Sequence, residues 1–226
     1  MSNHPGLSNT FSSSGEKFEW SKESLKSIKM IISRYPKDRH QSAVMPLLYL
    51  AQEQNNNWIS IECIEKIAET LNMPKIRVTE VASFYSMYNT RPVGKNLVQI
   101  CRTSPCWLRG SNKITNAICN ETKCDINETS EDNLFTVVEV ECLGACSNGP
   151  MIQINNDFYE DLEEESTKAI IDNIKNLEEL KSNIYDVGHF VYDVETDSLN
   201  ILEANLVGIS ICYDLETSYY LSLIHI

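Results

Sequence analysis

The chain has 226 residues and a formal net charge of −13 at pH 7, which is enough length for one large domain or two small ones. It contains no run of eighteen apolar residues, so the sequence predicts no membrane-spanning helix. The acidic balance argues against nucleic-acid binding. Residues 1–15 are rich in Ser and Asn and hold no Lys or Arg, unlike a secretory signal or an organellar presequence. We therefore expect residues 1–17 to be disordered and the protein to be cytoplasmic, with reduced thiols.

Four helical patterns follow one another and predict a small bundle over residues 18–90. In the first, apolar residues recur on one face and Pro36 ends the helix. In the second, Ser42 is the expected N-cap, and Pro46 falls in the first turn, where proline is tolerated. The aromatic-rich end of the fourth, residues 84–88, has two interpretations, a buried stripe or an interface patch. The expected helices cover residues 22–34 and 42–54, with two more that begin at residues 60 and 74.

Beyond a hinge at residues 91–95, strands and helices alternate. Such an alternation is typical of an α/β layer. The sequence therefore predicts an α+β fold, in which the helical bundle is followed by an α/β domain at residues 91–185. The expected elements of this domain are a strand at 96–101, a helix at 108–119, a strand at 134–140, a hairpin at 150–160 and a helix at 164–181.

Four cysteines stand in two close pairs, each in a turn that follows a strand. Cys101 and Cys106 follow the first strand of the α/β domain, and Cys142 and Cys146 follow the second. Because we expect a reducing compartment, a metal centre is favoured over disulfides. Gaps of four and three residues, with Gly and Pro nearby, suit a [2Fe–2S] cluster that takes its thiolates from two turns. A zinc site and a set of buried or redox-active thiols stay open as alternatives.

The sequence around these cysteines resembles a known family, the thioredoxin-like [2Fe–2S] ferredoxin of respiratory complex I, which is the subunit of bacterial NADH:quinone oxidoreductase that is designated E. The resemblance extends over about residues 18–182. It implies a thioredoxin-like fold for the α/β domain and a docking role for the helical bundle. The segments that carry it are CRTSPCWLRGS at 101–111, EVECLGACSNGPMIQIN at 139–155, SAVMPLL at 42–48 and VASFYSMY at 81–88.

The resemblance also implies a cofactor, its ligands and its partners. Cys101, Cys106, Cys142 and Cys146 would hold one [2Fe–2S] cluster, which exchanges electrons with FMN in the NADH-binding partner subunit. A large iron–sulfur subunit would be the second partner. The chain has no Gly-x-Gly-x-x-Gly motif, so FMN and NADH are expected only in the partner. We expect the assembly on the cytoplasmic face of the inner membrane, which this chain touches only indirectly. The alternative is the related diaphorase module of an NAD-linked hydrogenase or formate dehydrogenase.

The remaining cysteines are interpreted differently. Cys63 lies on the apolar stripe of the third helix, and we expect it in the core. Cys119 and Cys124 repeat the four-residue gap, but no Gly or Pro lies between them, and we interpret them as a solvated helix end rather than as ligands. Cys212 belongs to the C-terminal segment. The four histidines show no metal-ligand spacing.

The segment at residues 186–226 is foreign to the family. It resembles the opening strands of the 3′–5′ exonuclease domain of bacterial DNA polymerase I, with Asp193 and Glu195 at the first metal-binding positions. The further carboxylates that this chemistry needs are missing, so we expect no nuclease activity. We expect the segment to be poorly ordered or to form isolated strands. Our interpretation is a misassembled or truncated reading frame, and a lineage-specific extension is the alternative.

Overall fold

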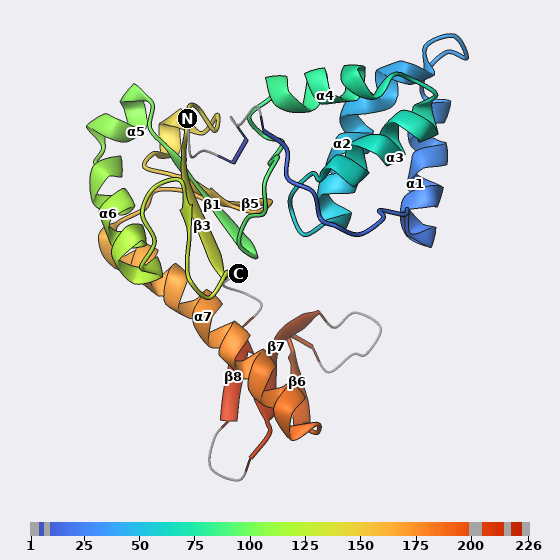
Figure 1. Cartoon of the computed structure of the whole chain (residues 1–226). Helices are drawn as coiled ribbons and strands as arrows, with labels where there is room; N and C mark the ends of the chain where they lie inside the picture. The colour runs from blue at the N-terminus through green and yellow to red at the C-terminus, as the bar shows by residue number, and fades with distance from the viewer. Residues whose placement is uncertain (1–4, 7–9, 199–204, 215–217, 223–226) are drawn as a thin grey trace. The chain divides into compact units, whose positions relative to one another are not determined.

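The computed structural model describes residues 5–6, 10–198, 205–214 and 218–222 (Figure 1). The chain divides into two compact units, Met1–Lys168 and Ala169–Ile226. The first unit contains the helical bundle and the sheet that carries the paired cysteines. Among the described residues, no helix has both the length and the apolar character that crossing a membrane requires.

The predicted helical bundle is present. Its core is lined by large aliphatic side chains such as Leu47, Leu48 and Ile64, each at most 1% exposed. The third helix begins as predicted, since Ser60 Oγ accepts a hydrogen bond from the N–H of Cys63 at 3.2 Å. The helices are α1 (Lys22–Ser33), α2 (Val44–Gln54), α3 (Ile61–Leu71) and α4 (Lys75–Phe84), with a short 3₁₀ turn, η1 (His40–Ala43), before α2.

The predicted cap of the second helix is wrong. Ser42 lies inside η1, where its N–H donates to the carbonyl of Arg39 at 2.9 Å, and α2 begins after Ala43 without a side-chain cap. The 3₁₀ turn satisfies backbone groups that a cap would otherwise satisfy. Pro46 lies in the first turn of α2, as expected.

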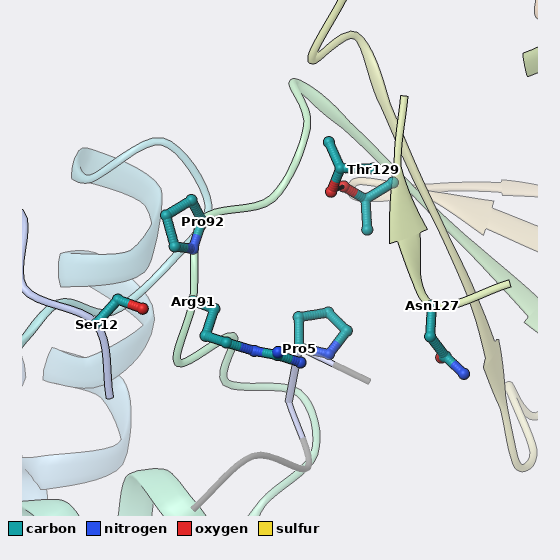
Figure 2. A pocket seen from close by; sticks show the side chains of 7 residues that line it. Pro5, Ser12, Arg91, Pro92, Asn127 and Thr129 are labelled. Carbon is teal, nitrogen blue, oxygen red and sulfur yellow. Dashed lines mark hydrogen bonds between the residues drawn. The ribbon is translucent and has the colours of Figure 1, made fainter. Parts of the chain in front are cut away.

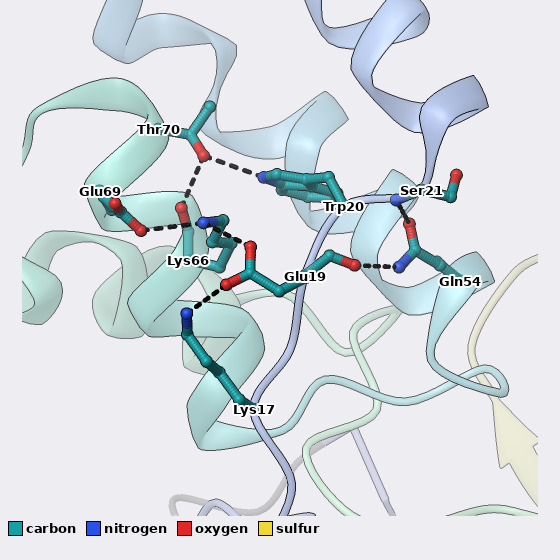
Figure 3. Close-up of polar contacts among 8 residues, drawn as sticks. All are labelled: Lys17, Glu19, Trp20, Ser21, Gln54, Lys66, Glu69 and Thr70. Atoms are coloured by element: carbon teal, nitrogen blue, oxygen red, sulfur yellow. Dashed lines mark hydrogen bonds and ion pairs between the residues drawn. The ribbon is translucent and has the colours of Figure 1, made fainter.

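The segment before α1 is fastened to the bundle by polar contacts (Figure 3). Glu19 forms an ion pair with Lys66 of α3 at 2.7 Å, and the indole N–H of Trp20 donates to Thr70 Oγ1 at 2.9 Å. The Gln54 side chain joins the segment to α2, because its amide N–H donates to the carbonyl of Glu19 at 2.7 Å. These contacts fix the direction in which the chain enters α1.

Part of the segment expected to be disordered also makes defined contacts. The Ser14 N–H and hydroxyl both donate to Glu62 Oε2, at 3.0 and 2.9 Å, and Ser12 N–H donates to the carbonyl of Thr90 at 3.1 Å. The described residues 10–17 therefore differ from the expectation, because an acidic side chain of α3 offers them acceptors that lie far along the sequence. Residues 1–4 and 7–9 lie outside the described residues.

A mixed sheet follows the hinge. Its strand order is β2-β3-β1-β4-β5, and the central pair, β1 and β3, is parallel while the remaining neighbours are antiparallel. The described helices and strands confirm the predicted α+β class. The strands are β1 (Asn96–Cys101), β2 (Glu128–Thr129), β3 (Phe135–Val140), β4 (Ile152–Ile154) and β5 (Asp157–Tyr159).

The predicted single helix at 108–119 is two helices in the structure, α5 (Ser104–Leu108) and α6 (Ser111–Thr122). The chain turns between them at Gly110, whose φ of 98° lies in the left-handed region that favours glycine. α6 packs beside the central strands β1 and β3 (Figure 1). This break leaves α5 as a separate short helix that carries Cys106.

The second unit contains a three-stranded antiparallel sheet of order β6-β7-β8. The strands are β6 (Val191–Thr196), β7 (Leu206–Cys212) and β8 (Ser218–Ser222). Asp193 and Glu195 are exposed on β6, and Glu195 accepts a hydrogen bond from the Tyr220 hydroxyl at 3.2 Å. The helix α7 (Glu164–Val187) continues through Asp186, where the resemblance to the family ends.

Candidate iron–sulfur site

The parallel pairing of β1 and β3 brings the two cysteine turns to one edge of the sheet. In the register of this pair, Cys101 lies opposite Val140, and the Arg102 N–H donates to the carbonyl of Val140 at 3.1 Å. Cys142 is only two residues beyond Val140. Because the carboxyl ends of parallel strands meet at the same edge, both turns begin next to each other.

The first cysteine pair is buried. Cys101 ends β1 and Cys106 lies in α5, and each is 1% exposed. Both pack against Met151, which lies just before β4, and this small cluster is covered by Leu143 and Ala145 from the second turn. The second turn therefore contacts the side chains of the first.

The second cysteine pair is exposed. Cys142 and Cys146 place their sulfur atoms 3.8 Å apart, and the 3₁₀ turn η2 (Cys146–Asn148) follows directly. Between them Gly144 has φ of 89°, and this backbone conformation lets its N–H donate to Cys142 Sγ at 3.3 Å. A backbone donor thus points at a sulfur atom, as is usual around sulfur-ligated clusters.

The ionisation of the buried pair is uneven. Burial on its own raises the pKa of Cys101, but hydrogen bonds from the Thr103 hydroxyl and from the main-chain N–H groups of Thr103 and Leu143 outweigh it and lower this pKa. Burial also raises the pKa of Cys106 to about 11, and the neighbouring Cys101 adds to the rise. A negative charge on Cys146 contributes to that rise as well, which reflects how close the two pairs lie.

The residues fit a cluster held by thiolates. A cysteine binds a metal as the deprotonated thiolate. Two buried thiols that do not both ionise easily are stabilised as thiolates by a cationic centre between them. The donor set consists of four sulfur atoms with backbone N–H groups directed at them. Within the described residues, no group of three or more Cys, His, Asp or Glu side chains surrounds a point where a single metal ion could bind.

Two contacts at the site were not foreseen from the sequence. Gly149 lies so close to Cys106 that an added Cβ would be 2.9 Å from the sulfur, so any larger residue at this position would require the sulfur to shift. The Arg109 guanidinium donates to the carbonyl of Ser147 at 2.8 Å and reaches Asp161 at 3.4 Å, which ties α5 to the second turn. No local pattern signals either contact, because the partners lie more than thirty positions apart.

The other cysteines lie elsewhere. Cys63 is fully buried in the bundle core, as expected. Cys119 is half-buried near the end of α6, and Cys124 is buried just after it, with its thiol donating to the carbonyl of Glu128 at 2.9 Å. The expectation of a solvated helix end is therefore wrong for Cys124, which is 5% exposed and bonds to Glu128 of β2. Cys212 ends β7.

A separate cavity of about 300 Å³ lies near the hinge (Figure 2). It is lined by Arg91 and Pro92 of the hinge, by Ser12, and by Asn127 and Thr129 from the side of β2. The described residues that line it include no cysteine or histidine.

The mixed sheet, the flanking helices and the cysteine turns at one sheet edge define a thioredoxin-like α/β domain with a candidate four-thiol site. The family model for thioredoxin-like [2Fe-2S] ferredoxins matches residues 28–175. The chain belongs to this family.

Named relatives agree with this membership. In Rickettsia bellii, the NADH-quinone oxidoreductase component designated E is 46% identical over 159 residues, which are 70% of this chain and 95% of that protein. The mitochondrial NADH dehydrogenase [ubiquinone] flavoprotein 2 of Dictyostelium discoideum is 48% identical over 70% of this chain and 64% of its own length.

A solved structure shares the fold at lower identity. The crystal structure of an NAD⁺-reducing [NiFe]-hydrogenase in the air-oxidized state matches with a TM-score of 0.51 and 17% identity. The match covers 58% of this chain and 23% of that one. At this identity the likeness concerns the fold alone.

Proposed function

We propose that this chain is the [2Fe–2S] electron-transfer subunit of an NADH-quinone oxidoreductase and has no catalytic activity alone. The observation that carries the proposal is the meeting of two cysteine pairs on neighbouring turns, in a chain whose family consists of [2Fe-2S] ferredoxins. The relative from Rickettsia bellii, which is named as a component of that enzyme, supports it.

The proposed ligands are Cys101, Cys106, Cys142 and Cys146. When bound, the cluster would supply one-electron transfer. The chain's own residues would hold it and set its electrostatic surroundings. Backbone N–H groups such as that of Gly144 stabilise negative charge on sulfur, whereas burial of the first pair disfavours added charge. The balance of these two influences would determine the reduction potential.

We propose that electrons enter and leave on the side of the second turn. Cys142 and Cys146 are exposed, whereas the first pair is buried. Beside them Trp107 and Leu108 of α5 are 54% and 75% exposed, and large apolar side chains of this kind are common in interface cores. The proposed partners are the subunit that binds NADH and FMN and the large iron–sulfur subunit. The assembled complex would be peripheral on the cytoplasmic face of the inner membrane.

The cofactor can be tested by metal and sulfide analysis of the full chain, purified without oxygen. We expect a brown protein with two irons and two acid-labile sulfides per chain. A colourless protein with stoichiometric zinc and no sulfide would contradict the proposal and favour a zinc-stabilised binding module.

The partners can be tested by affinity purification of the tagged chain from cells that make it. We expect an FMN-containing NADH-binding subunit to co-purify, and Leu108→Asp to reduce its recovery because it places a charge in the proposed contact. Asn112→Asp adds the same charge at an exposed position of α6 and serves as the control. Recovery of hydrogenase or formate dehydrogenase subunits instead would identify the diaphorase alternative and refute the proposed enzyme.

We further propose that the chain consists of residues 1–17, a bundle at 18–90, the cluster domain at 91–185, and a foreign segment from Asp186 onward. The exposed strand β6 and the exposed apolar side chains of that segment, such as Val191 and Tyr192, are consistent with an addition that lacks its original packing partners. Sequencing native transcripts across codon 186 tests this. A single native transcript that runs without interruption across codon 186 would refute the interpretation as a misassembled reading frame.

A further inference from the structure

We propose that Cys119 and Cys124 form a second thiol site, which closes reversibly into a disulfide when the chain meets a low-molecular-weight disulfide such as oxidised glutathione. This pair repeats the four-residue gap of Cys101 and Cys106, but the structure places it at the C-terminal end of α6, in a different local geometry.

The end of α6 brings the two residues together. Lys123 has φ of 51°, in the left-handed region, and the N–H of Cys124 donates to the carbonyl of Cys119 at 3.3 Å. A left-handed residue followed by a bond that spans six residues is the Schellman arrangement, in which the side chains of the two residues at the ends of the bond frequently meet. In this chain both of these residues are cysteines.

The same bond fixes the spacing of the two backbones. A backbone hydrogen bond of 3.3 Å, with the standard bond lengths on either side of it, keeps the Cα atoms of Cys119 and Cys124 within about 7 Å of each other. Disulfides need a Cα separation of about 4.4–6.8 Å. The spacing that this bond permits overlaps the range that a disulfide needs, so we propose that closure requires rotation of side chains rather than movement of the helix.

The exposure of the two thiols assigns their order of reaction. Cys119 is half-buried and accessible to a small reagent, whereas Cys124 is 5% exposed. Cys119 is therefore the residue that reacts first with the disulfide reagent, and Cys124 is the residue that resolves the adduct. To do so, Cys124 must turn its thiol away from the carbonyl of Glu128, to which it donates at 2.9 Å.

The surroundings make the reaction slow rather than fast. Burial raises the pKa of Cys119, and the negative charges of Asp125, Cys124 and Glu139 raise it further. Only a small fraction of the thiol is then ionised near neutral pH, and the thiolate is the reacting form. Equilibration over hours is therefore the suitable condition for a test.

The chemistry is a thiol–disulfide exchange in two steps. The thiolate of Cys119 attacks one sulfur of oxidised glutathione, a mixed disulfide forms, and the first glutathione leaves as a thiolate. The thiolate of Cys124 then attacks the Cys119 sulfur and releases the second glutathione. The two protein thiols lose two electrons and two protons in total. These electrons and protons end on the two released glutathione thiols.

Peptide mapping of the full chain, with its cluster in place, tests the proposal. The protein is equilibrated with mixtures of reduced and oxidised glutathione, blocked with iodoacetamide, and cut with trypsin and a Glu-specific protease. Both Glu121 and Lys123 lie between the two cysteines, so digestion leaves Cys119 on residues 114–121 and Cys124 on residues 124–128. We expect these peptides to be linked in more than half of the molecules in the most oxidising mixture and separate after dithiothreitol.

Variants and iron content control the result. Cys212→Ser should leave the linked peptides in place, and Cys119→Ser should abolish them and leave Cys124 alkylated. The iron content of the linked protein should equal that of the reduced protein. The proposal is overturned if Cys119 is alkylated in every mixture, if it is found only as a glutathione adduct or joined to another cysteine, or if the link appears only in protein that has lost iron.

Discussion

Gly149→Ala should weaken the chain's hold on its cluster. An alanine Cβ at this position would lie 2.9 Å from Cys106 Sγ and 3.4 Å from Cys106 Cα. Since ordinary contacts begin at 3.4 Å, the sulfur would have to move by about 0.5 Å. Metal–ligand distances in a well-formed site fall within about 0.2 Å of their usual values, and the displacement of this proposed ligand would exceed that range.

The effect of Gly149→Ala comes from the contact and not from the backbone. Gly149 has φ of −71° and ψ of 158°, a conformation that alanine adopts readily. The variant should therefore fold but suffer the overpacking cost of a well-packed core, about 1–3 kcal/mol.

The assay for Gly149→Ala is iron and acid-labile sulfide per chain after purification without oxygen. We expect the variant to retain less than half of the iron of the wild type. Ser147→Ala, an exposed substitution in the same turn, should retain all of it. If Gly149→Ala holds the wild-type amounts of iron and sulfide with an unchanged spectrum, the placement of Cys106 as a ligand is refuted.

Three predictions concern the helical bundle. Leu48→Ala should lower the free energy of unfolding by about 2–5 kcal/mol in urea denaturation, because Leu48 is fully buried; a loss below about 1 kcal/mol would mean that the site is less tightly packed than described. Tyr88→Phe should cost about 1 kcal/mol in the same assay, because the Tyr88 hydroxyl donates to the carbonyl of Met45 at 3.1 Å, and no loss would contradict that bond. Burial on its own raises the pKa of Glu62, but hydrogen bonds from the Ser13 hydroxyl and the Ser14 N–H outweigh it and lower the pKa from 4.5 to about 2. Because the unfolded chain then binds this proton more tightly, the carboxylate stabilises the fold above pH 4.5 and loses this effect as the pH falls toward 2. The stability difference between wild type and Glu62→Gln should shrink over that range, and a gap independent of pH would refute the contact.

Periodicity predicted the elements better than their ends. The helices of the bundle and the strands β1 and β3 were foreseen, because each has a clear apolar pattern of several residues. β2 was missed, since the pair Glu128–Thr129 is too short and polar to give such a pattern. The cap at Ser42 was wrong because a 3₁₀ turn, stabilised by its own backbone bonds, has no distinct side-chain signal.

The sequence predicts the residues of the candidate site, and the structure adds their geometry. Two cysteine pairs that follow two strands lie on neighbouring turns only if the strands are parallel. The pairing of β1 with β3, in which Cys101 lies opposite Val140, is parallel. Three features depend on contacts between residues far apart in sequence: the burial of one cysteine pair, the close approach of Gly149 to Cys106, and the hydrogen bond from Arg109 to Ser147. Such contacts arise from packing and cannot be inferred from spacing alone.

Electron paramagnetic resonance of the reduced full chain tests the central claim most directly, when wild type is compared with Cys142→Ala and Cys119→Ala. We predict one rhombic signal from a single binuclear cluster in the wild type, its survival in Cys119→Ala, and its loss in Cys142→Ala together with the iron. An unchanged signal in Cys142→Ala would show that the two turns do not share one iron–sulfur centre.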